Sequence, residues 1–226
     1  MTGWPSSVPE LIELQLELAT QHQTPWRLSG PARIGGCFVC FQRGQTGPGH
    51  AGDRGWAAAA LAGASTVIEG VAGAAYQAGL LALREGALLE RAVRELSEPP
   101  DVLLVDATGR DHPRRAGLAL HLGAVLGLAT VGVTHRSLLA TGEWPADAAR
   151  AFSPLLLEDE TVGYWLRTRP GRRPLAVHSA WRTDAETAVQ VVLASLAGMR
   201  TPQPLRDARR TARSARAMID PRRRAN

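Results

Sequence analysis

The stretch "LLVDATGRDHPRRAGLALHLG", residues 103–123, decides the fold. Its three leading aliphatic residues predict a buried strand, and Asp106 follows them directly. A helix is expected at about 114–126 and a short strand at 129–133, so helix and strand alternate as in an α/β protein. In an open α/β sheet, ligands bind beyond the carboxyl ends of the strands. Asp106 is therefore a candidate metal ligand; the alternative is an aspartate that only caps the following turn.

The turn after this strand carries groups that suit a phosphate. Gly109 permits a tight turn, and His112, Pro113 and Arg114 come just before the expected helix. An imidazole and a guanidinium fork near a helix N-terminus favour an anion. The alternative for His112 is a hydrogen bond to the backbone of its own loop.

The segments on either side of this block predict the remaining elements. An amphipathic helix is expected at 8–23, and three extended segments at 33–41, about 55–63 and about 65–72 indicate an antiparallel meander. The middle segment is rich in alanine, so a helix is the competing interpretation there. The clearest helix spans 80–97. The last expected elements are strands at 161–168 and 173–178 and a helix at 184–197.

Arginine supplies all the side-chain positive charge. The chain of 226 residues has 26 basic side chains, none of them lysine, and a formal net charge of +5. We expect one folded domain over residues 1–205 and a disordered tail over 206–226, where eight arginines occur with almost no large apolar side chain. The alternative for this tail is an arm that binds nucleic acid.

Composition also bears on location. No run approaches the roughly 18 apolar residues that a membrane helix needs. The N-terminal segment lacks the basic and apolar regions of a secretory signal. We therefore expect a monomeric cytoplasmic protein with no membrane partner.

Both cysteines lie in one predicted strand, "RIGGCFVCF", residues 33–41. Cys37 and Cys40 are three residues apart, so their side chains point to opposite faces of a sheet. A disulfide between them is excluded by that geometry, and no second pair exists to complete a zinc site.

Five blocks of the sequence resemble the endonuclease V family. They are "GGCFVCF", "YQAGLLALRE", "PDVLLVDATGRDHPRRAGLALHLG", "TVGV" and "PLAVHSAWR", in order within a match from about residue 8 to about residue 205. The resemblance implies a ribonuclease-H-like α/β fold: a central mixed β-sheet with an N-terminal antiparallel meander and helices on both faces. It also implies an endonuclease that uses Mg²⁺ (or Mn²⁺) to hydrolyse a phosphodiester near inosine in DNA or RNA.

The resemblance assigns roles to residues of this chain. Glu85 and Asp106 fall on the family's metal-binding carboxylates, although on spacing alone Glu85 is a surface carboxylate. Such carboxylates hold the cation that activates water and stabilises charge on the phosphate. The residues that the resemblance places against nucleic acid are Tyr76, at the strand-separating wedge, Gly79, Arg84, Gly109, His112, Pro113 and Arg114.

Three polar positions of the family are altered here. Cys37 stands where the resemblance implies a metal-binding aspartate, His135 replaces a lysine and Trp181 replaces a histidine. A neutral thiol is a poor ligand for Mg²⁺, so we expect impaired cleavage, with His135 kept as a catalytic candidate. The carboxylates that could compensate are Asp53, Asp111 and Asp184.

Two other interpretations stay open. A scaffold that lost its metal ligand but kept its arginines and glycines would bind nucleic acid without cutting it. Alternatively, Cys37 and His135 would form a thiolate–imidazole pair if these altered positions face one another. Trp181 would either fill the metal cleft or stack a base.

Overall fold

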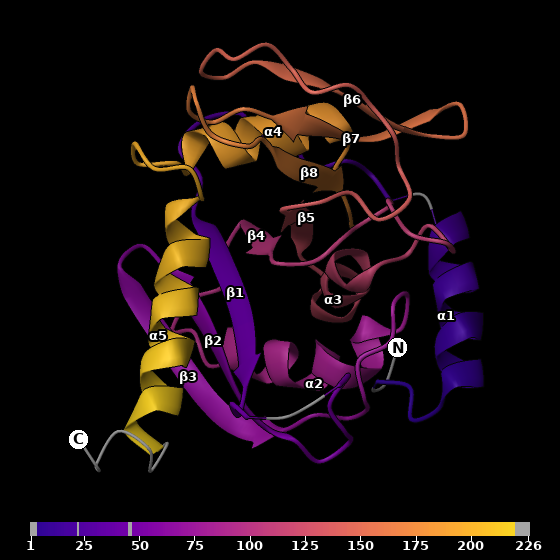
Figure 1. Cartoon of the computed structure of the whole chain (residues 1–226), viewed down its shortest axis with the longest axis vertical. Coiled ribbons are helices and arrows are strands. Elements are labelled where there is room, and N and C mark those ends of the chain that lie inside the picture. The colour runs from indigo at the N-terminus through magenta and orange to yellow at the C-terminus, as the bar shows by residue number, and fades with distance from the viewer. Residues whose placement is uncertain (1–3, 22, 45–46, 220–226) are drawn as a thin grey trace.

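An eight-stranded mixed sheet forms the centre of the molecule (Figure 1). The structure, a computed structural model, describes residues 4–21, 23–44 and 47–219. The strand order is β3-β2-β1-β4-β5-β8-β7-β6. The strands are β1 Ile34–Phe41, β2 Arg54–Leu61, β3 Ala64–Val71, β4 Val102–Val105, β5 Ala129–Thr134, β6 Phe152–Leu157, β7 Glu160–Leu166 and β8 Leu175–Ser179. The helices are α1 Val8–Thr20, α2 Leu81–Arg94, α3 Leu118–Leu126, α4 Ala185–Ala194 and α5 Gln203–Ile219.

The first three strands form the expected antiparallel meander. The alanine-rich segment is strand β2, which pairs with β1 on one side and β3 on the other. Ala57 and Ala59 pack in a cluster with α2, whereas Ala58 and Ala60 pack under α5 on the opposite face. Because helices cover both faces of β2, small side chains permit close packing on each side. Tertiary packing therefore overrides the weak strand propensity of alanine.

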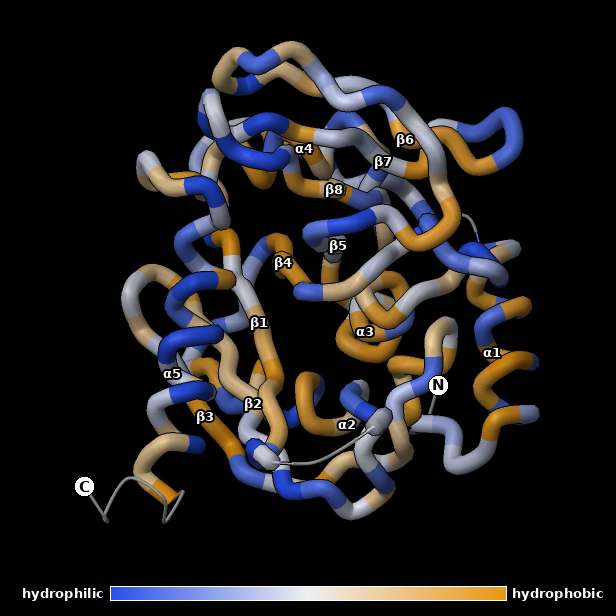
Figure 2. Tube along the Cα trace, viewed as in Figure 1, coloured by the Kyte–Doolittle hydropathy of each residue, from blue (hydrophilic) through white to orange (hydrophobic). Residues whose placement is uncertain are grey.

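The centre of the sheet is parallel and lies between two layers of helices. β1, β4 and β5 are parallel neighbours, and Cys37 on β1 is paired with Val105, the last residue of β4. Apolar side chains of α1, α2 and α3 pack on one face of the sheet, and those of α4 and α5 pack on the other. Figure 2 shows hydrophobic residues along the central strands between these layers. The predicted mixed sheet with helices on both faces is confirmed.

The helix after β4 begins later than expected. Arg115 has a left-handed backbone conformation (φ 54°), so the residues before Leu118 form a turn instead of the first turn of α3. Gly127 ends this helix in the left-handed region (φ 68°), as a C-terminal glycine often does. Among the described residues, no helix is both long and apolar enough to cross a membrane. The cytoplasmic location and the monomeric state stay predictions.

The arginine-rich segment contradicts the boundary expected at residue 205. Gln203–Ile219 form α5, which lies across the meander strands (Figure 1), so the prediction of disorder is wrong for residues 206–219. Residues 220–226 lie outside the described part of the chain. Ala208 and Ala212 are fully buried against Trp56 and Ala58. A helix face of small side chains was enough to seat α5, because the strand beneath it is also lined with small residues.

Strand β6 was not expected, because Pro154 interrupts its pattern. Proline lacks the N–H that a central strand needs, but an edge strand tolerates it. β6 is the edge strand beyond β7, and its pairing is irregular between Leu155 and Leu156. Phe152 packs edge-on against Tyr164 of β7, with ring centroids 5.2 Å apart. The edge position accounts for the missed strand.

The packing of α5 gives a first prediction. Ala208→Leu inserts a larger side chain between α5 and β2, and we expect it to lower the free energy of unfolding by about 1–3 kcal/mol. The control is Ala217→Leu on the exposed side of the same helix, which should change it by less than about 0.5 kcal/mol. Urea unfolding measures both. Equal effects of the two substitutions would show that α5 does not depend on this close contact.

Candidate active site

Asp106 lies at the carboxyl end of β4, as predicted, and an arginine from α5 binds its carboxylate. Nη2 of Arg209 donates to Oδ2 of Asp106 at 2.8 Å, and both side chains are partly buried. The Arg209 guanidinium also lies over the ring of Phe38, 5.1 Å from its centroid. Helix α5 therefore delivers a permanent cation to the position where the family resemblance implies a metal.

Glu85 on α2 and Cys37 on β1 are near enough to Asp106 to respond to its charge. Burial, reinforced by Asp106 and opposed by Arg84, raises the pKa of Glu85 to about 8. Burial, followed by the charges of Asp106 and Glu85, raises the pKa of the Cys37 thiol far above its usual value. The raised pKa values favour the protonated forms of both groups. A protonated Cys37 thiol is a weak nucleophile, which argues against the thiolate–imidazole interpretation.

This set of groups does not fit Mg²⁺ as it stands. The cation needs several oxygen ligands with negative charge. Asp106 is already bound to Arg209, and Cys37 offers a buried thiol in place of a carboxylate. Within residues 4–21, 23–44 and 47–219, no group of three or more His, Cys, Asp or Glu side chains is arranged to hold a metal.

The three carboxylates that could have compensated are used elsewhere. Asp53 forms a buried ion pair with Arg84 at 3.0 Å. Asp111 is fully buried and accepts three backbone N–H bonds from the loop after β5. Asp184 caps α4 and is bound by Arg27. Each of them stabilises the fold at a position of its own.

Arg84 does not lie where the resemblance placed it. Its side chain is buried, and its guanidinium binds Asp53 and the backbone carbonyls of His50 and Ala74. It also lies 4.0 Å from the ring centroid of Phe41. The structure thus places Arg84 in the core that connects β2 to α2, contrary to the prediction of a nucleic-acid contact.

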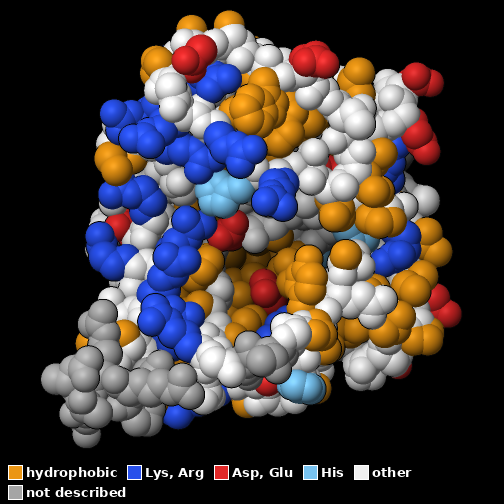
Figure 3. All heavy atoms as spheres, in the orientation of Figure 1, with side chains coloured by type: hydrophobic (Ala, Val, Ile, Leu, Met, Phe, Trp, Pro, Cys, Tyr) orange, Lys and Arg blue, Asp and Glu red, His pale blue; other side chains and the backbone are white. Residues whose placement is uncertain are grey.

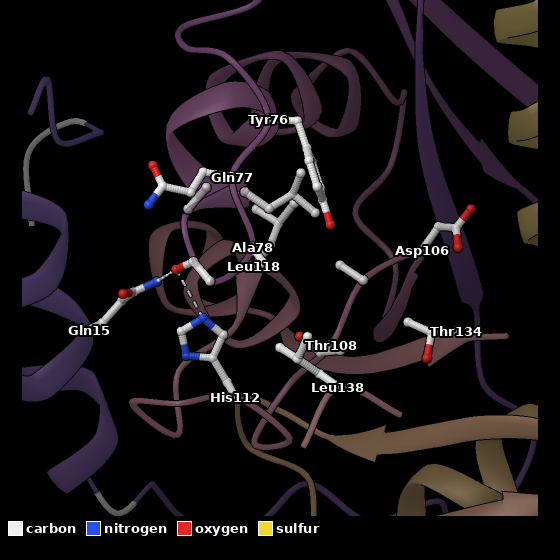
Figure 4. Close-up of a pocket in the computed structure, with 14 residues that line it drawn as sticks. Gln15, Tyr76, Gln77, Ala78, Asp106, Thr108, His112, Leu118, Thr134 and Leu138 are labelled. Carbon is white, nitrogen blue, oxygen red and sulfur yellow. Dashed lines mark hydrogen bonds between the residues drawn. The ribbon is translucent and has the colours of Figure 1, made fainter. Parts of the chain in front are cut away.

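A cavity of about 160 Å³ opens beside Asp106 (Figure 4). Tyr76 lines it with an exposed side chain, and Gly79 lines it next to the start of α2. The other lining residues are Gln15, Gln77, Ala78, Leu81, Ala82, Ala107, Thr108, His112, Leu118, Thr134 and Leu138. Polar and apolar side chains both line the cavity, as in many pockets that bind small ligands.

Three side chains converge on the carbonyl oxygen of Gly79 and hold the cavity wall in place. Gln15 donates to it at 3.2 Å, His112 at 3.1 Å and Arg114 at 2.8 Å. Gly79 itself has φ +78°, a conformation that favours glycine. The clamp joins α1, the loop before α2 and the turn after β4. His112 and Arg114 are thus close to the cavity, but both use donor groups to build it.

The turn motif after β4 therefore shapes the cavity. Burial lowers the pKa of His112 to about 4, so its ring is neutral, with Nδ1 accepting the backbone N–H of Arg114 at 3.2 Å. Gly109 lies against the carbonyl of Ser179, where a Cβ atom would come within 2.0 Å. Pro113 is exposed beside this turn. The backbone interpretation of His112 fits this structure better than that of a phosphate-binding cation.

His135 lies beside a cluster of arginines at the rim of the site. Nη1 of Arg200 donates to its Nδ1 at 3.2 Å. Burial and the charge of Arg200 lower the pKa of His135, so the ring is neutral at physiological pH. Arg136, Arg172 and Arg173 line the same hollow. Figure 3 shows the arginine side chains as a band that continues over α5, along one side of a hollow that contains acidic and hydrophobic side chains.

Trp181 lies away from this cluster. Its backbone pairs with Thr130 near the start of β5, at the opposite end of the strand from Thr134. Its Cβ packs close to Gly123 of α3, and the side chain belongs to the buried core. Trp181 thus neither fills the space beside Asp106 nor stands free to stack a base.

The sequence did not point to two residues of the site. Arg209 lay in the segment interpreted as a tail, although Leu205, Ala208 and Ala212, which are buried in the structure, follow helical spacing. Gln15 lies on the buried side of α1, where a polar side chain among leucines was the available signal. Its amide binds both Gly79 and Arg114.

Comparisons with known proteins agree on one family. The family model described as Endonuclease V matches residues 32–210. Endonuclease V of Xanthomonas campestris pathovar campestris is 35% identical over 219 residues, covering 93% of this chain and 89% of that protein. The crystal structure of endonuclease V from Streptomyces avermitilis has a TM-score of 0.83 at 30% identity and covers 96% of both chains. The predicted ribonuclease-H-like fold is confirmed.

A second solved structure supports the fold alone. It is endonuclease V of Ciona intestinalis (D234N) in complex with a 23mer DNA that contains an inosine followed by a ribo-adenosine. Its TM-score is 0.77 at 20% identity, with 94% of this chain and 98% of that chain covered.

The raised pKa of Glu85 makes stability depend on pH. Between its ordinary value of 4.5 and about 8, the folded protein binds this proton more tightly than the unfolded chain does. The folded state therefore loses stability as pH rises through that range. We expect Glu85→Gln to be more stable than wild type by about 1–2 kcal/mol near pH 9 and equal to it near pH 4.5. Urea unfolding across this pH range measures the difference, and Glu13→Gln at an exposed position of α1 is the control. A stability difference between Glu85→Gln and wild type that does not change with pH would contradict the prediction.

Proposed function

The chain belongs to the endonuclease V family, and on that premise we propose that it binds a nucleic-acid strand at an inosine and cleaves that strand only weakly. The observation that carries the proposal is the cavity whose lining joins Tyr76 to Asp106. A base flipped out of a strand needs such a pocket, and its backbone phosphate would then lie beside Asp106. The Ciona intestinalis relative, solved in complex with an inosine-containing DNA, supports the choice of base.

Recognition in this proposal is carried by fixed groups. The Gly79 clamp holds the pocket open, and Tyr76, with 53% of its surface exposed, offers a ring for stacking. The arginines beside His135 and along α5 supply positive charge for the strand's phosphates (Figure 3). These contacts suit both a DNA and an RNA strand.

Weak cleavage follows from the chemistry at Cys37. The family's reaction depends on a metal, for which Mg²⁺ or Mn²⁺ is our proposal. The buried Cys37 thiol provides neither the oxygen ligand nor the negative charge of the implied aspartate. Of the ligands that the family resemblance implies, Glu85 and Asp106 remain, and without the third carboxylate they would hold the cation only weakly.

Restoring the missing carboxylate tests this function. We expect Cys37→Asp to raise the rate of nicking of an inosine-containing oligonucleotide in Mn²⁺ by about tenfold or more, because it returns an oxygen ligand and a charge. Cys37→Ser is the matched control and should give no gain. The gain should disappear when Asp106→Ala is added. Wild-type cleavage as fast as that of Cys37→Asp, or cleavage that survives Asp106→Ala, would contradict the proposal.

A binding protein that does not cut is the second candidate, and the Asp106–Arg209 ion pair favours it. Binding should then persist in EDTA and weaken with salt. Tyr76→Ala should reduce the preference for inosine over adenosine by about fivefold or more, whereas Tyr76→Phe should keep it. Fluorescence anisotropy with labelled DNA and RNA strands measures both effects. Equal affinity for inosine-containing and plain strands would contradict recognition in either candidate.

A further inference from the structure

Arg209 is the one cation that hydrogen-bonds Asp106 among the contacts of the described residues. We propose that Arg209 acts as a built-in substitute for the divalent cation: it neutralises Asp106 and keeps a metal ion from binding there in the free protein. The inference rests on the proposed location of the family's metal at Asp106. It goes further by naming the residue that blocks the metal.

The position of Arg209 is fixed by its helix. Ala208 and Ala212, the neighbours on either side along the buried face, are 0% exposed and seat α5 on the sheet. The Arg209 guanidinium is further oriented by the ring of Phe38. Its Nε is buried and has no hydrogen-bond partner among the described residues, so the bond to Asp106 is what satisfies the charged end. A guanidinium in such a setting is directed at the carboxylate before any ligand arrives.

Charge balance explains why a single positive charge suffices here. A metal site with a carboxylate at position 37 would have one more negative charge, which a divalent cation neutralises. With Cys37 in that place, the site has less negative charge to neutralise, and the single positive charge of Arg209 is enough to neutralise Asp106. A metal ion entering beside Arg209 would meet like-charge repulsion, to which nearby Arg200 adds. The missing carboxylate at position 37 and the presence of Arg209 thus both lower the affinity of the site for a metal ion.

Arginine also makes this blockade permanent. An arginine side chain is a permanent cation, and its planar fork matches a carboxylate. A lysine at the same place could lose its proton when buried. Metal exclusion by Arg209 therefore does not depend on pH through the arginine itself.

Direct measurement of metal binding tests the inference without nucleic acid. Mn²⁺ is titrated into the full chain, and the free ion is followed by its electron paramagnetic resonance signal. Arg209→Gln should bind Mn²⁺ about tenfold more tightly than wild type, the size expected for releasing one partly buried ion pair. Arg213→Gln is the matched control: its guanidinium lies over the same Phe38 ring, 5.5 Å from the centroid, and it removes the same charge. It should change the affinity by less than about twofold.

A second background keeps the result decisive. The same comparison in Cys37→Asp, with folding checked by circular dichroism, should show the same tightening on top of a higher starting affinity. The inference is overturned if Arg209→Gln changes Mn²⁺ affinity by less than about threefold in every folded background, or if Arg213→Gln tightens binding as much. If Cys37→Asp does not fold, the comparison rests on wild type and Arg209→Gln alone. In that case, failure of both proteins to bind Mn²⁺ also counts against the inference. Mn²⁺ affinity is measured without nucleic acid. An unchanged Mn²⁺ affinity would therefore leave the proposed inosine recognition intact, and a lack of inosine recognition would leave the Mn²⁺ result intact.

Discussion

The structure depends on how the negative charge of Asp106 is balanced. A carboxylate at the end of a central parallel strand lies where ligands bind in open α/β sheets. Here the balancing charge comes from Arg209, so strand β4 and helix α5 are joined through their charged side chains. The packing of Ala208 and Ala212 seats α5 on the sheet, and this placement brings Arg209 over Phe38 and onto Asp106.

A second constraint shapes the cavity next to that ion pair. The Gly79 carbonyl accepts bonds from Gln15, His112 and Arg114, which come from three separate parts of the chain. A buried polar group is costly unless it is satisfied, and here the satisfaction of one carbonyl fixes a whole wall. His112 and Arg114, which the sequence suggested as phosphate ligands, therefore use their donor groups to build the pocket wall.

The sequence predicted those parts of the fold that depend on local pattern. The strand before Asp106, the meander and helix α2 could be found because periodicity and turn residues agree with the tertiary structure there. Helix α5 was missed, because alanine supplies much of its buried face and alanine gives a weak apolar signal; that face packs only because the residues of β2 beneath it are equally small. The role of Arg84 was also hidden, because a basic residue in a motif gives no sign of its buried partner Asp53.

The position of Arg209 changes how the altered residues Cys37 and His135 are interpreted. The resemblance implies a lysine where His135 stands, yet this histidine is neutral, since burial and the charge of Arg200 lower its pKa. The positive charge that faces Asp106 comes instead from Arg209, on an element far along the chain. Position 135 thus no longer supplies a cation, and position 37 no longer supplies a carboxylate. Because the two losses have opposite sign, the local charge stays balanced while the groups that would bind and activate a metal are reduced. This is the basis of the proposed function, in which the site holds a phosphate strand more readily than it cuts it.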